Sequence, residues 1–84
     1  MRKHYMTLCI RNNTEVTHII RDNKLEITFE QAVNGGFNTL VMLEDGTILS
    51  NEGFNSSDIA FFRDFLYRNV SVMKEEAMGG GCFA

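Results

Sequence analysis

One long amphipathic segment near the end of the chain limits the folds that this sequence can adopt. From Asn55 to Glu76 the apolar residues recur with the spacing of an α-helix. Asn55 is a suitable N-cap, and Asp58 places a negative charge near the positive end of the helix dipole. We therefore predict a single long helix over residues 55–76.

This helix has an apolar arc about half its circumference wide, which consists of two adjoining stripes. The first stripe contains Ile59, Phe62, Leu66, Val70 and Met73. The second stripe contains Phe61, Phe65 and Val72, and Asn69 interrupts the arc between the two. Because an apolar helix face needs a partner, we expect the first stripe to pack on a β-sheet formed by the preceding residues.

The preceding residues form short segments that favour strands, separated by turn residues. We expect strands over 5–10, 16–21, 25–29, 39–43 and 47–49. The segment from Phe29 to Val33 is ambiguous, and we favour a short helix or turn ended by Gly35 over a continued strand. Asp45-Gly46 is expected to form the tip of a hairpin with a type I′ turn.

Together these elements predict an α+β fold, in which a four- to five-stranded antiparallel sheet is covered on one face by the long C-terminal helix. A chain of 84 residues has room for one core. We expect one domain over residues 1–78 and a flexible Gly-rich tail over 79–84. No apolar stretch approaches the ~18 residues of a membrane span, and no signal peptide is recognised, so we expect a soluble cytoplasmic protein without a membrane partner.

The charge pattern argues against a nucleic-acid partner. The net charge is −3, and acidic and basic residues alternate along the chain instead of forming blocks. Binding to nucleic acid needs clustered Lys and Arg, and the one basic cluster, Arg2-Lys3-His4, is interpreted as a solvated terminus. We expect no direct binding to nucleic acid, and the expected partner is another protein or a second copy of the chain.

Few residues have the type and spacing that catalysis or metal binding requires. A metal site needs three or four converging ligands, and the histidines are limited to His4 and His18. We interpret His18 as a partly exposed strand residue and Cys9 as a small buried hydrophobe. Asn34-Gly35-Gly36 lacks the pattern of a phosphate loop. The sequence therefore predicts no enzyme and no cofactor, and a small metal-binding protein that uses His18 and Cys9 is kept as an alternative.

The C-terminal segment supports a second alternative. Residues 77–82, with their run of three glycines, are similar to the Gly-Gly processing site of bacterial peptide precursors. That resemblance implies a leader that is removed after two glycines. The chain would then be a precursor peptide with a folded leader and a processed tail.

The second stripe of the helix gives the main functional hypothesis. If the sheet covers only the first stripe, then Phe61, Phe65, Asn69 and Val72 form an exposed interface; a broad sheet would bury the whole arc. Periodicity does not decide between these two. We interpret the chain as a small non-enzymatic protein–protein interaction or regulatory module of bacterial, phage or mobile-element type, which acts as a homodimer or inhibits a host enzyme.

Overall fold

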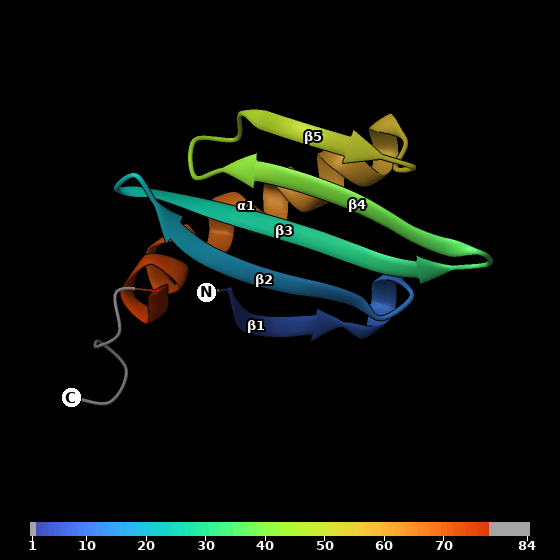
Figure 1. Cartoon of the computed structure of the whole chain (residues 1–84), viewed down its shortest axis with the longest axis horizontal. Coiled ribbons are helices and arrows are strands. Elements are labelled where there is room, and N and C mark those ends of the chain that lie inside the picture. Colours follow the sequence, from blue (N-terminus) through green and yellow to red (C-terminus); the bar gives the residue numbers. More distant parts are fainter. Residues whose placement is uncertain (1, 78–84) are drawn as a thin grey trace.

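The computed structural model describes residues 2–77 and has a five-stranded sheet and one long helix (Figure 1). The elements in chain order are β1 (Lys3–Leu8), the 3₁₀ turn η1 (Cys9–Arg11), β2 (Thr14–Arg21), β3 (Lys24–Val33), β4 (Gly36–Leu43), β5 (Ile48–Glu52) and α1 (Ser56–Ala77). The strands lie in the order of the chain, and every neighbouring pair is antiparallel. The predicted α+β fold is therefore confirmed.

The helix covers one face of the sheet, which we call the inner face. Figure 1 shows α1 crossing behind β4, β3 and β2. The sheet contributes to the core the fully buried residues Val16, Leu25, Ile27, Phe29, Leu40 and Met42. From the first stripe of the helix, Phe62, Leu66 and Met73 are buried, and Ile59 and Val70 are half-buried against this core. The packing predicted for this stripe is confirmed.

The helix begins at Ser56 because Asn55 caps it. The Asn55 side-chain oxygen accepts a hydrogen bond from the Asp58 amide at 2.8 Å, and the Asp58 carboxylate accepts one from the Asn55 amide at 3.3 Å. Each side chain thus satisfies a backbone N–H group that the first helical turn leaves without a partner. The cap predicted from the sequence is confirmed.

The type I′ turn predicted at Asp45-Gly46 is wrong. Only Gly46 of this pair has a positive φ, of 92°, whereas a type I′ turn needs positive φ at both central residues. The Gly46 amide donates to the Leu43 carbonyl at 2.9 Å and the Leu43 amide donates to the Thr47 carbonyl at 2.8 Å, so the loop has three residues and Gly46 takes its left-handed position. A two-residue hairpin turn with positive φ at both positions does occur at Asp22-Asn23, between β2 and β3.

Two further expectations about local structure are wrong. The segment from Phe29 to Val33 is not a short helix, because β3 continues to Val33 and pairs with β4 as far as Gly36. The strand expected over 5–10 ends at Leu8, and η1 follows it. The Thr14 hydroxyl donates to the Arg11 carbonyl at 2.6 Å, so the carbonyl group at the end of η1 has a hydrogen-bond partner. In both places, contacts with a neighbouring strand or turn decide the conformation.

Candidate protein interface

The first strand and η1 cover most of the second stripe of the helix. The Tyr5 ring packs edge-on against Phe65, with 6.2 Å between the ring centroids. The Tyr5 hydroxyl donates to Asn69 Oδ1 at 2.9 Å, and Asn69 Nδ2 donates to the Phe65 carbonyl at 2.8 Å. Asn69, which interrupts the apolar arc, therefore has partners within the same chain.

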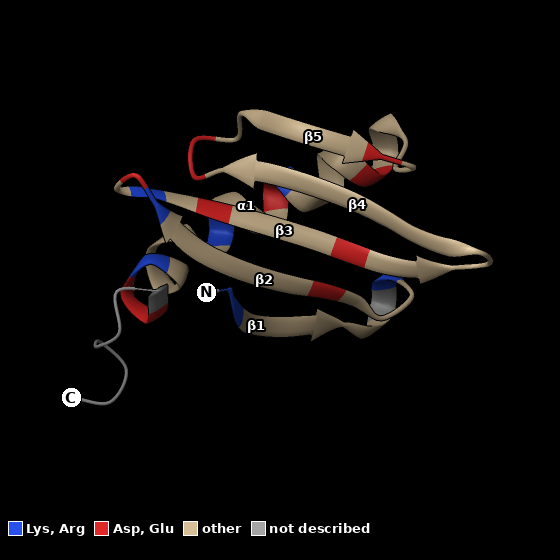
Figure 2. Cartoon of the chain, viewed as in Figure 1, with Lys and Arg blue, Asp and Glu red and all other residues tan. Residues whose placement is uncertain are grey.

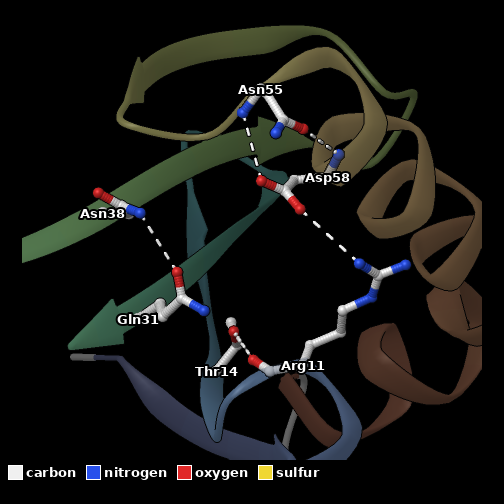
Figure 3. Close-up of polar contacts among 6 residues, drawn as sticks. All are labelled: Arg11, Thr14, Gln31, Asn38, Asn55 and Asp58. Carbon is white, nitrogen blue, oxygen red and sulfur yellow. Dashed lines mark hydrogen bonds and ion pairs between the residues drawn. The ribbon is translucent and has the colours of Figure 1, made fainter. Parts of the chain in front are cut away.

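The other end of the second stripe lies under η1. The Arg11 guanidinium lies 4.0 Å from the centroid of the Phe61 ring, and its Nη1 lies 3.7 Å from the Asp58 carboxylate (Figure 3). Phe61 and Phe65 are half-buried against the core, and Val72 is 48% exposed. The structure therefore does not gather Phe61, Phe65, Asn69 and Val72 into one exposed surface, because the sheet is broad enough to cover most of the arc.

The structure places His18 and Cys9 far from each other. His18 is fully buried on the inner face of β2, opposite Lys3, whereas Cys9 is exposed in η1 at the other end of the β1–β2 hairpin. Both sequence interpretations, a partly exposed His18 and a buried Cys9, are wrong, because the register that sets the facing of each residue is a long-range property. Within residues 2–77 no three His, Cys, Asp or Glu side chains lie close enough to hold a metal ion.

A hairpin that projects from the sheet is the most exposed apolar feature of the described residues. We call residues Gln31–Asn38 the β3–β4 arm. The neighbouring strands end just before it, because β2 reaches only Glu30 and β5 reaches only Thr39. The arm residues of β3 and β4 therefore pair only with each other, and Figure 1 shows them extending beyond the rest of the sheet.

The arm combines apolar side chains with an absence of charge. Phe37 is 61% exposed, more than any other large hydrophobic residue of the described part of the chain, and Val33 is 41% exposed. Ala32 is also exposed and lies directly opposite Phe37. No Lys, Arg, Asp or Glu occurs between Gln31 and Asn38, and Figure 2 shows no charged residue along this part of the ribbon. The sequence does not predict the arm, because it favours a short helix or turn over Phe29 to Val33, ended by Gly35, instead of a continued strand.

Polar contacts fix the base of the arm. Asn38 Nδ2 donates to Gln31 Oε1 at 3.2 Å, which joins the two strands on the inner face (Figure 3). The other face of the sheet is called the outer face. Glu30, which directly precedes the arm, lies on this face opposite Glu15 of β2. The uncharged arm therefore lies next to an acidic region of the outer face.

Comparison of the chain with protein-family models, curated proteins and solved structures finds no match. No helix within residues 2–77 is both long enough and apolar enough to cross a membrane. The run of glycines that suggested a processed tail lies outside the described residues. The arguments for function therefore rest on the fold and on the exposed surfaces described above.

Proposed function

We propose that the chain is a small non-enzymatic protein–protein interaction module, which contacts a second copy of itself through the β3–β4 arm. The observation that carries this proposal is the 61% exposure of Phe37 on an uncharged hairpin with no neighbouring strand. Exposed aromatic side chains outside the core are typical of contact surfaces. We prefer the arm to the second stripe of the helix as the contact surface, because β1 and η1 cover most of that stripe.

The stability of the arm supports a contact with another protein. A two-stranded hairpin alone in water is marginally stable. Both outer edges of the arm leave backbone N–H and C=O groups without a strand partner, and Phe37 and Val33 lie exposed. A protein surface placed against the outer face of the arm would remove Phe37 and Ala32 from water and restrict the hairpin.

The pattern of large and small residues favours a second copy as the partner. Phe37 and Ala32 lie directly opposite each other, on the same face of the arm. Two arms can stack face to face around a two-fold axis that runs parallel to their strands. The ring of each Phe37 then lies over the small Ala32 side chain of the other copy. The arm brings no charge into the centre of this contact, because no Lys, Arg, Asp or Glu occurs between Gln31 and Asn38; Glu30, on the same face, lies at its edge.

The oligomeric state tests the proposal. We expect light scattering coupled to size-exclusion chromatography to show a dimer whose fraction rises with protein concentration. Phe37→Asp should abolish the dimer, because it places a charge at the centre of the contact. Val72→Asp is the matched control, because it adds the same charge to an exposed apolar residue on the helix. Loss of the dimer in Val72→Asp alone would assign the interface to the helix instead.

A size exchange tests the pairing itself. Phe37→Ala should weaken the dimer, and the double variant Ala32→Phe/Phe37→Ala should restore it, because the large and small residues have then exchanged places on each arm. A wild-type chain that stays monomeric at high concentration would contradict the second-copy proposal. The arm would then have to serve a different protein, as in the hypothesis of a host-enzyme inhibitor.

A further inference from the structure

A buried histidine without a hydrogen-bond partner lies under the last turn of the helix. The His18 side chain is fully buried, and neither ring nitrogen has a hydrogen-bond partner among residues 2–77. The Glu76 carboxylate lies close to the ring, with its Oε1 3.6 Å from His18 Nε2. Buried polar groups are normally hydrogen-bonded, and a missing bond lowers the stability of the fold. His18 is thus an exception that calls for an explanation.

The groups around His18 come from the two elements that pack against it from either side. From β1, the Tyr5 ring lies 5.8 Å from the imidazole ring, and Lys3, opposite His18 in the sheet, donates through Nζ to the Glu76 carbonyl at 3.3 Å. From α1, Glu76 is the charged group that faces the ring. Burial, and then the charge of Glu76, raise the pKa of Tyr5, so the tyrosine stays neutral beside the imidazole. On β3, the residue opposite His18 is Ile27, which cannot titrate.

We propose that His18 and Glu76 form a proton-dependent clasp that fastens the last turn of α1 to the sheet. Histidine is the side chain that changes charge between about pH 5 and pH 8, whereas a carboxylate stays ionised over most of that range. Once protonated, His18 presents a charged donor to Glu76, and a shift of roughly 1 Å brings the two atoms within hydrogen-bond distance.

Two interactions stabilise the protonated form of the clasp. The Glu76 carboxylate offers an opposite charge, and the C-terminal end of α1 offers the negative end of the helix dipole. Complete burial and the ammonium group of Lys3 oppose the charge, but Lys3 is exposed to solvent and is screened. If the clasp forms as proposed, mild acidification tightens the end of α1, and neutral or alkaline pH loosens it. The proposal does not depend on dimer formation through the arm.

Hydrogen exchange of the backbone amides of residues 72–77 tests the clasp. Between about pH 8 and about pH 6, we expect the protection factors of these amides to rise about fivefold in the wild-type chain. In Glu76→Gln the rise should be much smaller, because the neutral amide can still accept a hydrogen bond but offers the imidazolium no opposite charge. Glu75→Gln is the matched control, because it removes the adjacent exposed carboxylate, and it should behave like the wild type. Protection that stays constant, falls on acidification, or rises equally in Glu76→Gln overturns the proposal.

A direct measurement follows the proton itself. The His4→Gln variant leaves one histidine, so that the ring resonances of His18 can be followed by NMR without overlap. We expect this ring to take up a proton over the same pH interval in which the helix end becomes protected, with the fold intact. A ring that stays neutral until the protein unfolds would show that the clasp does not form.

Discussion

Asn38 holds its side chain in the space that a Cβ atom on Gly53 would occupy. Gly53 follows β5 with a φ of 99°, and a Cβ built there would overlap the Asn38 amide and lie 3.1 Å from the Asn38 Cβ. The same Asn38 amide donates to Gln31 at the base of the β3–β4 arm. The end of β5 and the base of the arm can therefore approach closely only because residue 53 has no side chain.

The first prediction concerns this close approach. Gly53→Ala should lower the free energy of unfolding by roughly 3 kcal/mol, because it adds left-handed backbone strain to the displacement of Asn38. Gly35→Ala is the matched control, since Gly35 has a φ of 87° and no atom within 4 Å of the added Cβ. It should cost only the strain, about 1 kcal/mol. Urea unfolding measures both values, and equal losses would mean that the Asn38 contact adds nothing.

The helix cap gives the second prediction. Asn55→Ala should lower the free energy of unfolding by about 1 kcal/mol, because the Asp58 amide loses its acceptor, whereas Asn55→Gly should cost only a few tenths. Ser57→Ala, at an exposed position in the same turn, should change stability by less than ~0.5 kcal/mol. Thermal or urea unfolding compares the three variants. A loss in Ser57→Ala as large as in Asn55→Ala would contradict the capping role.

The features predicted correctly from the sequence are those with a local signal. Asn55 and Asp58 are close in the chain, so the helix start could be recognised from the residue types alone. The same holds for the stripe that includes Phe62 and Leu66, because helical periodicity places these residues on one face whatever they pack against.

The features that were missed depend on partners distant in the sequence. Phe29 to Val33 forms a strand because β4 pairs along its whole length. His18 is buried because of the register in which β2 pairs with its neighbours. The alternation of residue types within β2 does not determine that register. The covering of Phe61 depends on Arg11, fifty residues earlier in the chain, and no property of the helix indicates it. Local propensity cannot report contacts of this kind.

The third prediction tests the aromatic core. The Phe62 ring stacks on Phe29 with 4.6 Å between centroids and meets Phe54 edge-on at 5.0 Å. Phe62→Ala should therefore cost ~3–5 kcal/mol, enough to unfold a large fraction of a domain of this size. Phe61→Ala should cost clearly less, because Phe61 is only half-buried. Circular dichroism during urea unfolding distinguishes the two, and equal losses would place Phe61 in the core.

A carboxylate joins the β4–β5 turn to both the sheet and the helix. Glu44 Oε2 accepts a hydrogen bond from Lys74 Nζ of α1 at 3.0 Å, and Oε1 accepts one from the Leu25 amide of β3 at 3.1 Å. The hydrogen bond from Lys74, followed by that from Leu25, holds the pKa of Glu44 below its usual value of 4.5. Because the pKa is lower in the folded state, the ionised carboxylate stabilises the fold.

The fourth prediction follows from the sign of this shift. The stabilisation by Glu44 is complete above the usual pKa of 4.5 and is lost as the pH falls through the lower folded-state value. The wild type should therefore be more stable than Glu44→Gln at neutral pH by an amount that stays constant down to about pH 5.5 and shrinks below about pH 4.5. Urea unfolding at a series of pH values measures this difference. Glu52→Gln, at the exposed end of β5, is the control and should show no such pH-dependent gap; a gap that widened on acidification would mean that Glu44 destabilises the fold.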